Sequence, residues 1–287
     1  MNISVQVFDP DRIATDVQLF CSEIDHDPWV MFHGTSGFNA DAIEREGFRP
    51  QLNMVSREEL QRVASVYEAM KWAGESWGGL PVLKPFSLDH DLRDPTTGLL
   101  FFAETSLRAL LYATLDFAGG EKLRALRFAF ADLDSYLREP AVRERHETKM
   151  LANFRSLIGM NAHPSMIEIA RPVKVDLDWL REQMDALANI RWVADDAERR
   201  HDHGIVYAVK MTPDDLQGLQ WNSSMGIEAT TTIPASKMLA KIAVPRDYSC
   251  NLFADCGDEY IRRQSAGLIP ALARQANRAA PGSVSLT

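Results

Sequence analysis

The segment Trp29–Phe32 places the first firm constraint on the fold, because it is a short apolar run that breaks abruptly into polar residues. Short apolar runs bounded by turn signals are typical of buried strands. His33, Gly34 and Thr35 follow directly, so an imidazole, a residue without a side chain and a hydroxyl meet at the end of this strand. Imidazole and hydroxyl groups can hydrogen-bond a ligand, and glycine lets a ligand approach the backbone. The alternative is a buried histidine followed by an ordinary turn.

Helical and strand-like patterns alternate along the rest of the chain. Ser56 followed by Glu59 is a capping-box pattern that predicts the start of a helix, and Gly47 predicts the end of another. Helices are expected at 11–22, 39–46, 56–77, 105–113, 138–160 and 176–190. Strands are expected at 3–8, 98–103, 166–170, 204–211, 227–233 and 237–244, while residues 121–137 fit either state. This mixture predicts an α+β fold.

The composition narrows the functional classes. The chain has 287 residues and a formal net charge of -9, which disfavours non-specific nucleic-acid binding because that depends on Lys and Arg. Cys21, Cys250 and Cys256 form no CxxC motif and favour a reducing compartment. The N-terminus lacks a basic segment followed by an apolar one, and no stretch approaches the roughly 18 apolar residues of a membrane span. We therefore expect a cytoplasmic protein without a membrane partner.

Two later segments combine with the first into a longer pattern. In one of them, Gly98, Phe102 and Ala103 lie on a predicted strand. An amphipathic helix follows and carries Ser106 and Tyr112, with Tyr112 nine positions after Ala103. A strand that begins with glycine and leads into a helix with a tyrosine at this spacing is weak evidence for a function by itself. It becomes more specific in combination with the segments before and after it.

The last segment begins with Gly204–Val209, the strongest strand signal in the chain. The polar residues Trp221–Ser224 follow as a predicted turn, and Glu228 then begins another strand. In this order the three segments resemble the ADP-ribosyltransferase family, in particular its His-Tyr-Glu branch. That branch includes the poly(ADP-ribose) polymerases and the diphtheria-type toxins.

The resemblance implies a particular fold and organisation. The expected fold is a split β-sandwich around an NAD⁺ cleft, decorated by helical insertions. A single catalytic domain would occupy residues 1–250, with insertions at about 54–96 and 120–200 that match nothing in the family pattern. Residues 251–287 would form a C-terminal extension that is partly flexible.

The resemblance also assigns roles in a reaction with NAD⁺ as co-substrate and no metal. Glu228 would stabilise the oxocarbenium-like transition state in which the ribose–nicotinamide bond breaks. Tyr112 would stack on nicotinamide, and Gly34 would offer its backbone to the carboxamide. His33 would bond the adenosine ribose, so the implied catalytic residues are Glu228, His33 and Tyr112. The implied NAD⁺-binding residues are His33, Gly34, Thr35, Phe102, Ala103, Ser106 and Tyr112.

Bland interpretations exist for several of these residues. A tyrosine on an amphipathic helix is commonly part of the core, as Tyr112 would then be. Glu228 on an apolar strand can be an exposed residue of the alternate face. His201 and His203, on either side of Asp202, suit a metal site by type, but their polar surroundings favour a solvated loop.

The acceptor of the transferred group is expected to be a macromolecule, either protein or nucleic acid. The loop before the catalytic glutamate commonly meets the target in this family, so Trp221, Asn222 and Ser223 are candidate target-binding residues. Arginine-modifying members carry a glutamate two positions before the catalytic one, where this chain has Gly226. Arginine is therefore a disfavoured acceptor.

The resulting hypothesis is a mono-ADP-ribosyltransferase acting as a toxin or phage-defence effector, with a neutralising antitoxin protein as a possible partner. One alternative is an NAD-dependent RNA 2′-phosphotransferase. That chemistry needs a basic phosphate pocket, to which Arg191, Arg199 and Arg200 are the nearest approach. The other alternative is a non-catalytic NAD or ADP-ribose-binding module.

Overall fold

The computed structural model describes residues 3–16, 18–50, 55–71, 100–222, 226–248 and 266–279. The chain divides into two compact units. Unit 1 comprises Met1–Leu52, Thr97–Gly120 and Glu198–Thr287, and unit 2 comprises Asn53–Thr96 and Glu121–Ala197. The predicted mixture of helices and strands is confirmed, with the strands in two separate sheets. The segments of unit 2 run close to the ranges 54–96 and 120–200 that the sequence sets apart.

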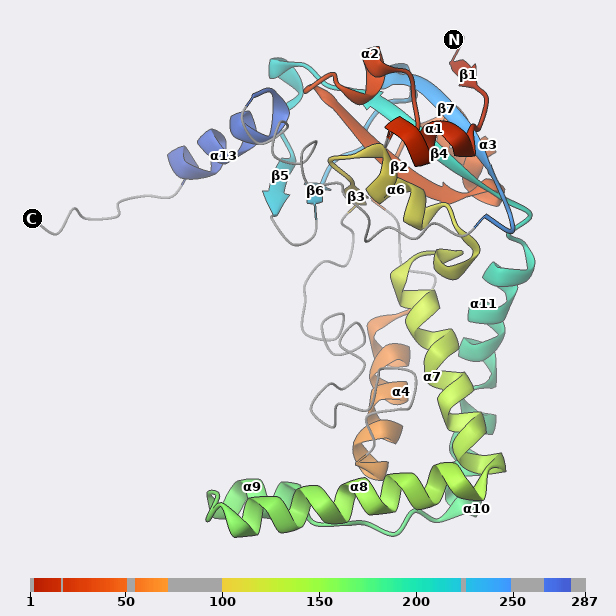
Figure 1. The fold of residues 1–287 in the computed structure, drawn as a ribbon, viewed down its shortest axis with the longest axis vertical. Helices are drawn as coiled ribbons and strands as arrows, with labels where there is room; N and C mark the ends of the chain where they lie inside the picture. The colour runs from red at the N-terminus through yellow and green to blue at the C-terminus, as the bar shows by residue number, and fades with distance from the viewer. Residues whose placement is uncertain are drawn as a thin grey trace, which may run out of the picture. The chain divides into compact units, whose positions relative to one another are not determined.

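Both sheets belong to unit 1 (Figure 1). The first has the strand order β1-β7-β4-β2, and only its β1–β7 pair is parallel among the described strands. Its strands are β1 (Ser4–Gln6), β7 (Met238–Pro245), β4 (His203–Lys210) and β2 (Val30–Ser36). The second sheet is antiparallel, in the order β3-β6-β5. Its strands are β3 (Leu100–Phe102), β6 (Gly226–Ala229) and β5 (Leu219–Asn222).

The strands predicted at 204–211 and 237–244 are confirmed as β4 and β7. The strand predicted at 227–233 is too long, because β6 ends at Ala229. Ile233 instead exchanges backbone hydrogen bonds with Phe48, both of 2.8 Å, and so belongs to a separate bridge. The prediction for 98–103 is confirmed for Leu100–Phe102, while Gly98 lies outside the described residues.

One hydrophobic core contains side chains from both sheets. Successive side chains of a strand point to opposite faces, so each strand contributes every second residue to it. The first sheet contributes Met31 and Tyr207, and the second contributes Phe102 and Ile227, all at most 1% exposed. Leu268 and Leu272 of α13 (Leu268–Ala279) join this core, so part of the predicted C-terminal extension is a packed helix.

A second core covers the other face of the first sheet. It joins Phe32, Val206 and Ala208 of the sheet to Leu107 and Leu110 of α6 (Ser106–Tyr112). Thr105 caps this helix by accepting a hydrogen bond of 3.2 Å from the backbone N–H of Arg108. The helix predicted at 105–113 is therefore confirmed, and it is fixed against β2 and β4.

Two glycines allow α6 to lie directly on the sheet. A Cβ atom at Gly34 would lie 1.7 Å from the carbonyl oxygen of Ala109, and one at Gly204 would lie 1.8 Å from that of Ala113. These distances are far below van der Waals contact, so any larger residue would push the helix away. Gly34 therefore has a packing role in addition to any role in binding.

The remaining helical segments of unit 1 are short. Gly47, with φ of +82°, ends α3 as predicted. The helix predicted at 11–22 ends at Asp16, and the buried Asp25 accepts two backbone hydrogen bonds of 2.8 Å, from Leu19 and Phe20. The segments are α1 (Pro10–Asp16), α2 (Ser22–Asp25), η1 (Gly37–Asn39), α3 (Ala40–Glu46), η2 (Leu115–Phe117), η3 (Pro213–Asp215) and η4 (Ala235–Lys237).

The described part of unit 2 is helical (Figure 1). Its core is built around Val63, Met70, Leu126, Leu133 and Leu180, each at most 1% exposed. The helices are α4 (Arg57–Met70), α7 (Glu121–Arg138), α8 (Pro140–Gly159), α9 (Pro164–Ile169), α10 (Leu177–Ala186) and α11 (Ala188–Arg199). Across all described residues, no helix combines the length and apolarity needed to cross a membrane.

Sequence patterns in unit 2 were only partly informative. The capping box of Ser56 and Glu59 is confirmed, since each side chain bonds the other's backbone N–H, at 3.2 and 2.7 Å. The strand predicted at 166–170 is wrong, because α9 occupies this segment. Pro164 in the first turn and the His163 side chain, which accepts from the N–H of Ser165, favour the helix there.

Gly34→Ala tests the packing of α6. The methyl group has no room beside the Ala109 carbonyl, so the variant should lose at least about 3 kcal/mol of unfolding free energy, or fail to fold. Urea denaturation measures the change. Gly159→Ala is the matched control, because nothing lies within 4 Å of its added Cβ, and its stability should be unchanged or slightly higher. Equal stability of the two variants would contradict the close packing.

Candidate functional site

A pair of backbone hydrogen bonds joins the two sheets where the first two predicted motifs meet. The N–H of Phe32 donates to the carbonyl of Ala103 at 2.9 Å, and the N–H of Ala103 donates to that of Phe32 at 2.7 Å. The strand that carries His33 is therefore held against the end of the strand that carries Phe102. Two segments that are distant in the sequence meet at this point.

His33 extends this junction with its side chain. Its Nδ1 lies 2.9 Å from the carbonyl oxygen of Phe101, and its ring packs against those of Phe48 and Phe102 at centroid distances of 5.1 and 5.3 Å. Burial lowers the pKa of His33 from 6.5 to about 4, outweighing the opposite effect of the hydrogen bond to Phe101. The imidazole is therefore neutral near pH 7.

The neutral state determines what His33 can do. A carbonyl oxygen only accepts hydrogen bonds, so Nδ1 must carry the ring proton. Nε2 is then an acceptor, which suits a ligand hydroxyl such as that of a ribose. The bland interpretation as a buried histidine and the functional one are compatible, because the same packing that neutralises His33 fixes its tautomer.

Glu228 is placed next to this junction by strand pairing. In the β3–β6 register, Glu228 lies opposite Phe101, the residue whose carbonyl receives the His33 bond. In the β5–β6 register, Glu228 lies opposite Gln220. Register partners share a face of the sheet, and their Cβ atoms are about 4.5–5.5 Å apart. Phe101, Glu228 and Gln220 therefore form one row across three strands, which we call the Glu228 row.

The Glu228 row lies on the face away from the core. Phe102 and Ile227, which alternate with it, are each 1% exposed, whereas Gln220 is exposed and Glu228 is half-buried. The alternate-face interpretation of Glu228 is thus geometrically correct, and its half-buried side chain lies on the same face as that of Phe101. Sequence reasoning missed Gln220, although the apolar–polar–apolar order of residues 219–221 indicates an outward-facing residue.

The other predicted NAD⁺-binding residues lie on or beside β2, β3 and α6. Tyr112 is half-buried at the end of α6, where its ring lies 5.1 Å from that of Phe117. Thr35 is buried, and its Oγ1 accepts a 3.0 Å hydrogen bond from Asn39. Ser106 is fully buried, and among the described residues its Oγ has no hydrogen-bond partner. Phe102, Ala103 and Gly34 belong to the packing already described.

An ion pair with a buried carboxylate also lies at the edge of this region. Glu104 is 1% exposed, and its carboxylate receives two hydrogen bonds from Arg108, of 2.9 and 3.2 Å. A Cβ at Gly226 would lie 3.8 Å from the Glu104 Oε2 and 2.6 Å from the carbonyl oxygen of Phe102. Gly226, with φ of +103°, thus lets β6 begin close to β3 and Glu104. Sequence reasoning missed this pair.

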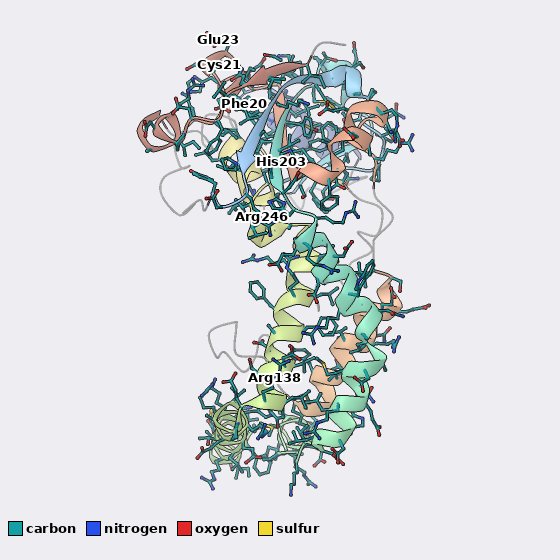
Figure 2. The ribbon with its side chains drawn as sticks, turned by 90° about the vertical axis from the view of Figure 1, so that its right-hand side faces the viewer. Phe20, Cys21, Glu23, Arg138, His203 and Arg246 are labelled. Atoms are coloured by element: carbon teal, nitrogen blue, oxygen red, sulfur yellow. The ribbon has the colours of Figure 1, made fainter. Side chains whose placement is uncertain are left out.

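The segment around His201 differs from the predicted solvated loop. His201 is fully buried, and its Nδ1 lies 2.7 Å from the Oγ of the buried Ser36. His203 begins β4, and its ring occupies the space beside Gly37, where a Cβ would lie only 2.4 Å away. Figure 2 shows His203 at the same edge of unit 1 as Arg246, which follows its strand partner Pro245. No group of metal-ligating side chains occurs among the described residues.

The predicted target-binding turn is partly a strand. Trp221 and Asn222 belong to β5, because Leu219–Asn222 pairs with β6. Trp221 packs against the core between the sheets, on the face opposite Gln220, so its side chain does not join the Glu228 row. Ser223 lies outside the described residues.

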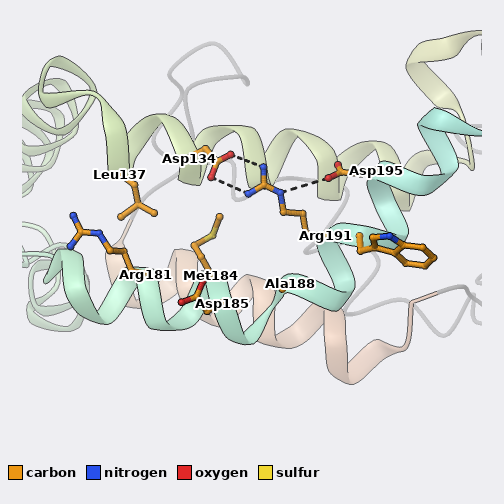
Figure 3. Close-up of a pocket in the computed structure, with 9 residues that line it drawn as sticks. Asp134, Leu137, Arg181, Met184, Asp185, Ala188, Arg191 and Asp195 are labelled. Atoms are coloured by element: carbon orange, nitrogen blue, oxygen red, sulfur yellow. Dashed lines mark hydrogen bonds and ion pairs between the residues drawn. The ribbon is translucent and has the colours of Figure 1, made fainter.

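Unit 2 contains a separate hollow of about 420 Å³ (Figure 3). Arg191 forms a bidentate pair with Asp134 across it, at 2.7 and 3.1 Å, and this hydrogen bonding raises the pKa of Arg191. Asp185 and Asp195 also line the hollow. Arg181 is the second arginine of the lining, and it pairs with Asp178, which is not one of the lining residues. Three carboxylates beside two paired arginines would repel a pyrophosphate, so this hollow does not suit NAD⁺.

No family model, curated protein or solved structure matches this chain. The functional interpretation therefore depends on the geometry of the chain itself. The structure brings His33, Gly34, Phe102 and Ala103 together directly. Glu228 lies next to them because it is the strand partner of Phe101, whose carbonyl bonds His33. The structure attaches Tyr112 through α6, which lies on Gly34.

His33→Gln tests the low pKa of the imidazole. Because the folded pKa of about 4 lies below 6.5, the unfolded chain binds the proton first, so stability should fall as the pH drops from about 6.5 to about 4. Glutamine keeps an N–H donor but does not titrate. Between about pH 7 and pH 4.5 the wild type should lose roughly 2–3 kcal/mol more unfolding free energy than the variant.

Urea denaturation at both pH values measures this difference. An imidazole NMR titration provides a direct check, since His33 should remain neutral down to about pH 5. Equal losses in the wild type and the variant, or a His33 midpoint near 6.5, would show that burial does not disfavour the charged ring.

Proposed function

We propose that this chain transfers ADP-ribose from NAD⁺ to a macromolecular acceptor in a single, non-polymerising step. The observation that carries the proposal is the junction at which the His33 imidazole donates to Phe101, whose strand partner is Glu228. An uncharged hydrogen-bonding ring and a half-buried carboxylate are thereby fixed on adjoining elements. The sandwich of two sheets joined at Phe32 and Ala103 supports an ADP-ribosyltransferase-like split β-sandwich.

The proposed reaction breaks the bond between the nicotinamide nitrogen and the ribose C1′. The bonding electron pair leaves with nicotinamide, so the ribose develops oxocarbenium character. The Glu228 carboxylate stabilises this positive charge, and an acceptor atom then attacks C1′ and releases its proton to solvent. His33 holds a ribose hydroxyl through Nε2, and Tyr112 stacks on the nicotinamide ring.

The backbone at Gly34 supports the same proposal in a second way. Because Gly34 has no side chain, both α6 and a ligand carboxamide can approach the strand there. A toxin or phage-defence role, with a neutralising protein partner, is a further part of the proposal taken from the family resemblance. The alternative RNA 2′-phosphotransferase activity has less support, because Arg108 on α6 is already paired with Glu104.

Glu228→Gln tests the proposed catalytic carboxylate. The amide keeps the size of the side chain but loses its charge, so nicotinamide release from NAD⁺ should fall by roughly 10²–10³. Release is measured by chromatography with and without cell extract. Glu182→Gln, an exposed residue of α10, is the matched control and should retain full activity.

Two further arms separate the alternatives. Labelled NAD⁺ is incubated with protein, RNA and DNA pools separately, and the label is expected on one macromolecular class. The RNA 2′-phosphotransferase alternative is tested separately with 2′-phosphorylated RNA. In that reaction the phosphate moves from the RNA to the ADP-ribose part of NAD⁺, so a phosphorylated ADP-ribose product distinguishes the phosphotransferase from the transferase. An unchanged rate in Glu228→Gln would remove Glu228 from the mechanism, and absence of nicotinamide release in the wild type would favour a non-catalytic binding module.

A further inference from the structure

The Glu228 row has two distinct ends. Phe101 at one end lies on β3, and its carbonyl is bonded to His33. Gln220 at the other end lies on β5, which pairs with β6 on the side away from β3. If NAD⁺ binds at His33, as the proposed function requires, the Phe101 end faces the dinucleotide. The Gln220 end is then on the far side of Glu228.

Gln220 has the properties of a recognition residue. It is exposed, its neighbours Leu219 and Ile227 are each 1% exposed, and its register partner is Glu228. The cross-strand distance of about 5 Å between Cβ atoms brings its amide within reach of any group that approaches the Glu228 carboxylate. An amide both donates and accepts, so it can bond an uncharged polar side chain in two ways.

The charges around the row favour an uncharged acceptor. Glu104 brings a second carboxylate near the start of β6, but Arg108 already binds it with two hydrogen bonds. Among the described residues of the row, Glu228 is the one that carries a charge. The Glu104 carboxylate therefore already holds a guanidinium and is not available to that of an arginine acceptor. The formal net charge of -9 also favours a protein over a nucleic acid as the partner.

We propose that Gln220 is a specificity-determining residue, whose amide holds the uncharged polar side chain of a protein acceptor beside Glu228. This inference rests on the proposed function and names the acceptor side of the same site. Water needs no such recognition, so hydrolysis of NAD⁺ should not depend on Gln220. Transfer to protein should depend on it.

Gln220→Ala separates the two reactions in paired samples, one with extract and one without. Labelled NAD⁺ is incubated with the full chain and a nuclease-treated bacterial protein extract, and label on protein is measured alongside nicotinamide released without extract. Transfer should fall about tenfold, the effect of one lost hydrogen bond. Release without extract should stay within about twofold of the wild type. Gln217→Ala, another exposed glutamine just before β5, is the matched control and should change neither rate.

The outcomes are distinguishable from failure of the proposed function. No nicotinamide release by the wild type would overturn the transferase itself. Normal release with unchanged transfer in Gln220→Ala would overturn the role of Gln220 alone. An equal fall in both rates would place Gln220 on the NAD⁺ side and also overturn it. Label that appears on an added RNA pool and not on protein would overturn the protein acceptor.

Discussion

The arrangement of unit 1 depends on how closely a helix can approach a sheet. At Gly34 and Gly204 no side chain separates β2 and β4 from α6 and its C-cap, so the carbonyl oxygens of Ala109 and Ala113 lie close to where Cβ atoms would otherwise be. With α6 at this depth, the end of β3 reaches Phe32 and the two sheets join through backbone hydrogen bonds. The same closeness brings the helix that carries Tyr112 to the strand that carries His33.

The junction gives each proposed group a physical reason for its state. Aromatic neighbours bury the His33 ring and keep it neutral, and the Phe101 carbonyl fixes its tautomer. Strand alternation places the Glu228 carboxylate on the outer face of a sheet whose inner face is fully apolar. The neutral His33 ring can accept a hydrogen bond from a ribose hydroxyl, and the Glu228 carboxylate can stabilise positive charge. Together they suit a substrate that has ribose hydroxyls and develops positive charge. The site is thus a product of packing and register more than of any single motif.

The sequence predicted the elements that have a clear local signal. Gly47 ended α3, Ser56 and Glu59 began α4, and the apolar run at 204–211 became β4. It failed where a local pattern was ambiguous or where burial is decided by distant segments. The apolar run at 166–170 has a strand-like pattern, but Pro164 starts a helix there. His201 lies in a polar stretch of the sequence, but in the fold it is buried and contacts Ser36 of β2. Gln220 and Glu104 acquire meaning only from pairing with distant residues, which periodicity does not reveal.

The pairing of β2 with β4 has a consequence for the newly made chain. Val30 lies opposite Lys210, so the first long strand leaves the ribosome well before its partner is synthesised. All the helices of unit 2 are translated in the interval. During that time the apolar residues of β2 have no sheet to join, and such strands are prone to aggregate. The segments of unit 2 end at Ala197, so this unit is fully synthesised before β4 and β7 emerge, whereas unit 1 must wait for these C-terminal strands, which makes its assembly a late step.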